Sequence, residues 1–165
     1  MSKLDELLAT WRDVREGCIE EIARIPEDRL DFRATAEMRS VLEIARHIIE
    51  GEQLLVSEIC RDDTDIRRVL GAQPDGRAKA ATTGEALTNL LRASREEAAQ
   101  QIRQFGEDKI DRLMTGFDGK EISKFSMLSF LVGHEMYHRG QLTVYQRLLG
   151  IEPALTERFR KMSDQ

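Results

Sequence analysis

Hydrophobic residues recur every three or four positions in four long stretches of the chain, which is the spacing of helices that each bury one face. These stretches predict helices at residues 2–25, 40–60, 82–106 and 125–150. Charged residues fill much of the rest, including Arg15 and Glu21 in the first helix, and Arg95 is expected on the solvated outer face of the third. The pattern therefore predicts an all-α fold in which amphipathic helices pack as a bundle.

Local signals mark the ends of several of these helices. Pro26 is expected to end the first helix, because the residue before a proline avoids the helical conformation. The second helix begins with a capping-box pattern formed by Ser40 and Glu43. Thr82 and Glu85 form the same pattern at the start of the third helix, where the hydroxyl and the carboxylate would each accept a backbone N–H.

Two connections are long enough to matter for topology. Residues 61–81 reach about 70 Å when fully extended, which exceeds the length of a bundle helix. The second and third helices therefore need not be antiparallel neighbours, and a crossover along the bundle is allowed. Residues 107–124 contain Asp118-Gly119, a turn dipeptide that fits either a small hairpin or an irregular loop.

Length, composition and charge narrow the class of protein. The chain has 165 residues, 41% hydrophobic and 33% charged, as expected for one compact soluble domain over residues 1–165. A net charge of −5 without a basic cluster argues against a nucleic-acid partner. Neither a signal peptide nor a membrane-spanning run is recognisable, so a cytoplasmic protein is expected. Cys18 and Cys60 are then expected to be small buried residues rather than a disulfide pair.

The candidate chemistry lies in the only three histidines of the chain, His47, His134 and His138. His134 and His138 are four residues apart, so both lie in the apolar stripe of the last predicted helix. Buried imidazoles need partners for their nitrogens, and one metal ion would supply a partner for each ring. If the second helix packs against the last, His47 can join them, which predicts a three-histidine metal site.

The alternative is that each histidine is an ordinary core residue, hydrogen-bonded within the protein. Glu135 follows His134, but the spacing HExxxH lacks the register of the HExxH zinc-protease motif. Glu135 is therefore not expected to act as a general base. It is interpreted as a residue that either supports a metal ligand or lies on the surface.

Glycines inside the predicted helices require an explanation, because each weakens a helix by about 1 kcal/mol relative to alanine. Gly51, one turn after His47, either leaves room beside the imidazole or allows another helix to pack closely. Gly133 and Gly140 lie on the side of the last helix away from the histidines. The same line carries Ser129, Met136 and Val144. Close approach of another helix would explain this line, from this chain or from a second copy in a homodimer.

Two segments carry a resemblance to a known family. The segment HEMYHRGQL at residues 134–142 resembles the HxxxHRGQL signature of the DinB/YfiT-like metalloprotein superfamily, and SVLEIARH at residues 40–47 is similar to its helix-two motif. The resemblance implies a four-helix bundle with a long crossover between helices two and three, commonly dimeric. It also implies a divalent metal bound through His47, His134 and His138.

Three imidazoles with an open position are typical of a catalytic metal site rather than a closed structural one. Zn or Ni is the expected metal, although imidazole also suits Fe and Cu. Superfamily members that use low-molecular-weight thiols imply a metal-dependent thiol S-transferase acting on a small electrophilic molecule. The alternatives are a metal-dependent hydrolase, which needs no thiol, and a non-enzymatic metal-binding stress-response protein. Neither Cys18 nor Cys60 is expected to act as a nucleophile.

Overall fold

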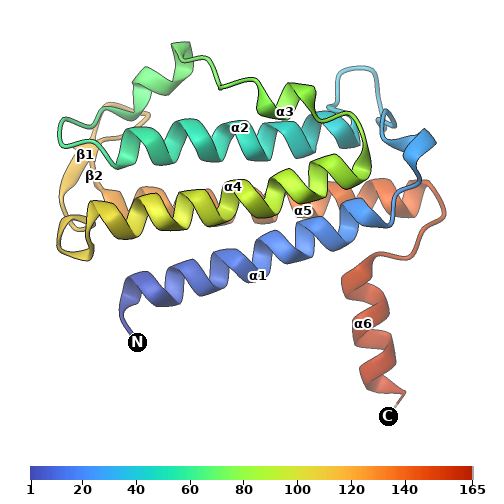
Figure 1. Ribbon diagram of the computed structural model, residues 1–165. Coiled ribbons are helices and arrows are strands. Elements are labelled where there is room, and N and C mark those ends of the chain that lie inside the picture. The colour runs from blue at the N-terminus through green and yellow to red at the C-terminus, as the bar shows by residue number, and fades with distance from the viewer. Residues whose placement is uncertain (165) are drawn as a thin grey trace.

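The computed structural model describes residues 1–164. Its four long helices form a bundle (Figure 1) and comprise α1 (Lys3–Ala23), α2 (Val41–Ile59), α4 (Gly84–Phe105) and α5 (Lys124–Leu148). Helices α1 and α2 each pack against both α4 and α5. Figure 1 shows α2 and α4 running in one direction while α1 and α5 run in the other. The predicted all-α bundle is confirmed.

The connection between α2 and α4 is a crossover. The chain returns along the length of the bundle through a 3₁₀ helix, η2 (Ile66–Gly71), and a single turn, α3 (Arg77–Ala80) (Figure 1). Arg46 on α2 holds this return, since its guanidinium donates to the carbonyl oxygens of Ala78 and Ala81 at 3.0 and 2.8 Å. The crossover lets α2 and α4 be parallel neighbours, as the length of the connection allowed.

A small hairpin precedes α5. Strand β1 (Leu113–Thr115) pairs antiparallel with β2 (Glu121–Ser123), with Met114 opposite Ile122. Gly119 in the turn has φ of +78°, a conformation that favours glycine. Of the two structures open for this connector, the hairpin is the one that forms. Two short 3₁₀ helices also lie in connections, η1 (Glu27–Arg29) and η3 (Glu107–Lys109).

The start of α4 differs from the prediction by one residue. Thr83, not Thr82, is the N-cap, and its hydroxyl accepts from the backbone N–H of Ala86 at 3.1 Å. The N–H of Gly84 is bound at 3.0 Å by the carboxylate of Glu27, which lies outside the helix. With Thr83 as the N-cap, the N3 position is Ala86, which has no carboxylate, so the predicted capping box does not form.

A further helix, α6 (Ala154–Ser163), follows the bundle and was not predicted from the sequence. It leaves the end of the bundle at an angle (Figure 1). The carboxylate of Glu21 on α1 accepts from the backbone N–H of Ala154 at 2.8 Å. Glu21 is fully buried, and its carboxylate binds a free N–H group in the first turn of α6, where a negative charge is favoured.

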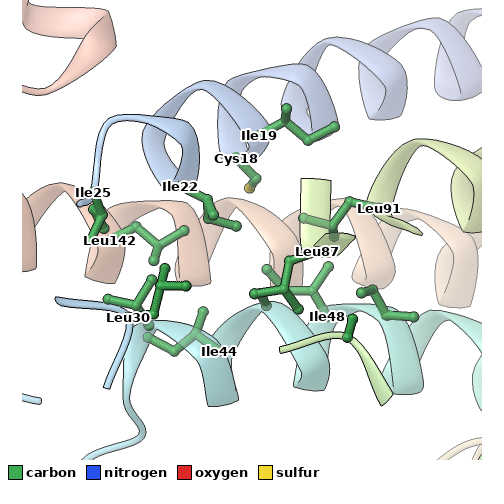
Figure 2. Close-up of a cluster of buried hydrophobic side chains, with 14 of the residues drawn as sticks. Cys18, Ile19, Ile22, Ile25, Leu30, Ile44, Ile48, Leu87, Leu91 and Leu142 are labelled. Carbon is green, nitrogen blue, oxygen red and sulfur yellow. The ribbon is translucent and has the colours of Figure 1, made fainter. Parts of the chain in front are cut away.

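The hydrophobic core consists of two clusters along the bundle axis. The first includes Cys18 and Ile22 of α1 and Ile48 of α2 (Figure 2), and the second surrounds Trp11. Arg95 belongs to this interior and not to a solvated face, because its guanidinium lies 4.3 Å from the centroid of the Trp11 ring. No helix within residues 1–164 has the length and apolarity needed to cross a membrane.

Candidate metal centre

The three histidines meet where α2 packs against α5. His47 is on α2, and His134 and His138 are one turn apart on α5. Nε2 of His134 lies 3.1 Å from Nε2 of His47 and 3.1 Å from Nε2 of His138. The candidate ligand atoms of all three rings lie within 4.8 Å of one another. The fold therefore brings together the three residues that the sequence singled out.

Hydrogen bonds within the protein do not satisfy this cluster. Nδ1 of His138 lies 2.7 Å from Oε1 of Gln141, so a neutral His138 carries its proton on Nδ1 and presents a lone pair at Nε2. Nε2 of His134 can carry only one proton, yet it faces Nε2 of both His47 and His138. At least one of the two pairs of nitrogens therefore has no hydrogen bond between them.

A small divalent cation fits this arrangement. Nitrogens bound to zinc at about 2.0–2.1 Å in a tetrahedral site lie about 3.3 Å apart, close to the 3.1 Å observed here. Gln141 meanwhile holds the distal nitrogen of His138, which is the support that a metal-ligating histidine requires. The donor set and its spacing are therefore compatible with a transition-metal ion.

The three rings are neutral at pH 7. Partial burial lowers the pKa of His47 to about 4 and the pKa of His134 to about 4, and it lowers the pKa of His138 as well. The positive charge of Arg39 acts in the same direction on all three pKa values. Because neutral imidazole is the form that ligates a metal, no proton needs to leave before binding.

Gly51 lies beside one of these rings. The nearest atom to a Cβ placed at this position is Cε1 of His134, at 3.8 Å, and no other atom of the described chain lies within 4 Å. At 3.8 Å an added methyl group would make only an ordinary van der Waals contact with the imidazole, so neither of the two explanations left open for Gly51 is borne out. The imidazole is that of His134 and not that of His47.

A cavity of about 810 Å³ opens beside the cluster and is lined by His47, Gln141 and Tyr145. This volume is within the range of about 300–1,000 Å³ that is usual for small-molecule sites. The remaining lining is mostly charged and comprises Arg33, Glu37, Met38, Arg39, Glu43, Arg46, Glu50 and Lys79. A polar small molecule can therefore reach the histidines from the His47 side.

Glu135 turns away from the histidines into a buried polar layer between the two hydrophobic clusters. Its carboxylate accepts from Nε1 of Trp11 at 2.7 Å and from Nη2 of Arg15 at 3.0 Å. Arg15 also donates to Glu52 at 2.9 Å, and all three charged side chains are at most 2% exposed. Both interpretations of Glu135 are therefore wrong, since it neither supports a metal ligand nor lies on the surface.

Both carboxylates of this layer act on the pKa of Arg15. Burial alone would lower that pKa, but Glu52 and Glu135 outweigh it and the pKa is raised. Burial raises the pKa of Glu52, and the shared Arg15 charge opposes that shift only in part. The layer joins α1, α2 and α5, so it fixes the two helices that carry the histidines relative to each other.

The residue after His138 has a structural role that the sequence did not reveal. The Arg139 guanidinium lies over Gly17 of α1, so close that a Cβ at Gly17 would stand 2.2 Å from its central carbon. It also lies 3.7 Å from the buried carboxylate of Glu21. Within the HRGQ segment, Arg139 therefore anchors α5 to α1 while Gln141 orients His138.

The cysteines are free thiols away from this chemistry. Cys18 is buried, and burial raises its pKa well above the usual value. Burial also raises the pKa of Cys60, to about 11. Both side chains are protonated at pH 7, which agrees with the expectation that neither acts as a nucleophile.

Fold and site together define a helical-bundle protein with a candidate three-histidine metal centre. The chain belongs to the DinB family, whose sequence model matches residues 1–165. One relative is the uncharacterized protein YjoA of Bacillus subtilis (strain 168), 22% identical over 152 residues that cover 91% of this chain and 93% of YjoA.

Solved structures of DinB-like proteins share the fold. The crystal structure of YjoA superimposes with a TM-score of 0.68 at 20% identity, covering 88% of this chain and 92% of YjoA. YfiT from Bacillus subtilis, described as a probable metal-dependent hydrolase with an unusual four-helix bundle topology, has a TM-score of 0.68 at 14% identity and covers 92% of this chain and 91% of YfiT. A mycothiol-dependent maleylpyruvate isomerase has a TM-score of 0.65 at 13% identity, covering 86% of this chain and 61% of the isomerase.

Proposed function

We propose that the chain binds one divalent transition metal ion, Zn or Ni, through His47, His134 and His138, and transfers a low-molecular-weight thiol to a small electrophilic substrate. The observation that carries the proposal is the convergence of three Nε2 atoms, two pairs of them 3.1 Å apart, beside a cavity of about 810 Å³. The structural neighbours support it, since one is described as metal-dependent and another as mycothiol-dependent.

The residues in and around the histidine cluster have different roles in this proposal. Three neutral imidazoles hold the ion, and Gln141 keeps the proton of His138 on Nδ1 so that Nε2 remains free to bind. When bound, the ion supplies Lewis acidity that favours the deprotonated form of a water or a thiol at neutral pH. The cavity admits both reactants on the His47 side.

An external thiol fits better than a nucleophile of the protein. Cys18 is buried and Cys60 is held protonated, as described above. The hydroxyl of Tyr145, which lines the cavity, donates to the carbonyl oxygen of Arg39 at 2.7 Å. Glu135 is bound by Trp11 and Arg15. None of these side chains is therefore free to act as a nucleophile, and the proposed nucleophile is a thiol that enters the cavity from solution.

Metal-dependent hydrolysis is the second candidate, supported by the description of YfiT. The two reactions are separated with metal-loaded protein by following 1-chloro-2,4-dinitrobenzene with bacillithiol or mycothiol, and p-nitrophenyl acetate without thiol. Thiol-dependent turnover that disappears in His138→Ala and persists in the surface variant Glu96→Gln supports the transferase. Ester cleavage without thiol favours the hydrolase. Metal-dependent stabilisation without any turnover would favour a non-enzymatic metal-binding stress-response protein.

The proposal includes a homodimer in the cytoplasm. A Cβ added at Gly133 or at Gly140, on the outer face of α5, would meet no atom of the described chain within 4 Å, so no helix of this chain explains these glycines. Met136 and Val144 on the same face are 49% and 51% exposed. A second copy packed on α5 would account for both observations. Light scattering at micromolar concentration tests this, and a monomeric mass would rule the dimer out.

A further inference from the structure

Arg39 combines a fixed backbone with a free charge at the mouth of the cavity. The hydroxyl of Tyr145, a residue only 1% exposed, donates to the Arg39 carbonyl oxygen at 2.7 Å. The next residue, Ser40, is the N-cap of α2 and closes a capping box with Glu43. Within residues 1–164, nothing lies within hydrogen-bond or ion-pair distance of the Arg39 guanidinium. The protein therefore positions this cation without using it in the fold.

This cation faces the histidine cluster. Arg39 lines the same cavity as His47 and Gln141. A group held by Arg39 would consequently lie beside the cluster and not at a remote part of the surface.

The cavity lining is positive although the chain carries a net charge of −5. Four basic side chains line it against three acidic ones. Arg33 is paired with Glu43 at 3.2 Å, whereas Arg46 donates to backbone carbonyls and so keeps its charge uncompensated by a carboxylate. The Lys79 ammonium also has no partner within the described residues. Arg39 and Lys79 thus remain available to a ligand, and the carboxylates that face them across the same cavity lining are those of Glu37 and Glu50.

Building on the proposed metal site, we infer that the substrate or its thiol partner carries an oxyanion group, a carboxylate or a phosphate, which Arg39 and Lys79 bind. The planar guanidinium of Arg39 can accommodate two oxygens of such a group at once. With the anion held at the cavity mouth, the reacting atom of the same molecule faces the three histidines. Neutral molecules of the same size would lack this anchor.

The test is a titration followed by ¹H–¹⁵N NMR, with succinate, inorganic phosphate and neutral succinamide as probes. Each is added to metal-free and to metal-loaded protein, and the metal content is measured separately by elemental analysis. We expect saturable binding of succinate or phosphate but not of succinamide. Preference between the two anions distinguishes a carboxylate from a phosphate ligand.

Matched variants assign the binding to Arg39. Arg39→Gln should weaken anion binding about tenfold or more, because a charge-assisted contact is lost. Arg39→Lys should retain part of it, and Arg103→Gln, which removes an exposed arginine of α4 outside the cavity, should change nothing. Equal anion binding by wild type and Arg39→Gln would overturn the inference, since a group other than Arg39 would then bind the anion. No saturable anion binding would overturn it as well.

The outcome for the anion is separate from the outcome for the metal. A chain that lacks metal but still binds succinate through Arg39 would refute the metal site and keep the anion site. A chain that binds metal yet treats succinate and succinamide alike would refute the anion site and keep the metal site.

Discussion

Replacing Glu135 with glutamine removes one of the two carboxylates that hold Arg15 in the buried polar layer. The substitution keeps the shape of the side chain but sets an NH₂ group against the N–H donors of Arg15 and Trp11. Removing one partner of a buried ion pair costs about 3–5 kcal/mol. Because Glu52 still binds Arg15 at 2.9 Å and the amide keeps one acceptor, we expect the lower end, about 3 kcal/mol.

Urea unfolding of the metal-free protein, followed by circular dichroism, measures this loss directly. In thermal unfolding of the same proteins, a loss of about 3 kcal/mol corresponds to a decrease in Tm of roughly 6–12 °C for a chain of this size. Glu96→Gln is the matched control, because Glu96 is exposed on α4 and its substitution should stay within about 0.5 kcal/mol. Metal stoichiometry should not change in Glu135→Gln, since its carboxylate does not touch the histidines.

The reasoning would be refuted if Glu135→Gln unfolded at the same urea concentration as Glu96→Gln. In that case the polar layer would contribute nothing to stability and could not be what aligns α2 with α5. Loss of metal with unchanged stability would also contradict it, because Glu135 would then act on the metal site and not on the fold.

Three further predictions follow from other contacts. Gln141→Leu should weaken metal affinity about 10–100-fold in a chelator competition assay, because His138 loses the partner of Nδ1; unchanged affinity would contradict the assigned role. Gly17→Ala should lower the free energy of unfolding by about 1 kcal/mol, because the new methyl group displaces the guanidinium of Arg139 from Glu21, which outweighs the gain in helix propensity. Gly140→Ala, where no atom lies within 4 Å in this chain, is its control and should stabilise an isolated monomer by roughly 0.5–1 kcal/mol. In urea titrations the metal-free protein should lose stability as the pH falls from 6.5 towards 4. In this range His47 and His134 bind protons in the unfolded chain but not in the folded protein, where the pKa of each is about 4. A stability that does not change with pH would contradict those pKa values.

Periodicity alone was sufficient for the long helices and for the histidines. The apolar stripes of α2 and α5 indicate which faces meet, so the i, i+4 pair on α5 and His47 on α2 were able to approach each other if these helices packed together. The resemblance of residues 134–142 to a known signature added the four-helix arrangement with its crossover. The family match over residues 1–165 and the likeness to YjoA and YfiT confirm that identification.

The features that the sequence did not reveal all depend on partners far apart in the chain. Arg15 lies one helical turn after Trp11 and one before Cys18, so it belongs to the buried face, but a charge there is tolerated only because Glu52 and Glu135 meet it. At the start of α4, the N–H of Gly84 is bound by Glu27, a partner that lies 57 residues earlier in the chain. Helix α6 does have a signal in the sequence, since Leu155, Phe159 and Met162 recur at helical spacing after Pro153, but these side chains stay exposed instead of joining the core.

The basic lining of the cavity also depends on residues that are far apart in the chain. Arg33, Arg39 and Arg46 precede or belong to α2, whereas Lys79 arrives with the crossover, so no contiguous basic cluster exists in the sequence. Their charges gather only after the chain returns along the bundle. An acidic net charge therefore did not predict a positive site.

The most direct test of the central claim is the metal content per chain, measured by elemental analysis on untagged wild type and on the double variant His134→Ala/His138→Ala. Circular dichroism of both proteins establishes that the helices are intact. We predict about one divalent transition metal ion per chain in the wild type and none in the variant. No metal in either protein after reconstitution with Zn and Ni, or equal metal in both, would contradict a three-histidine metal centre.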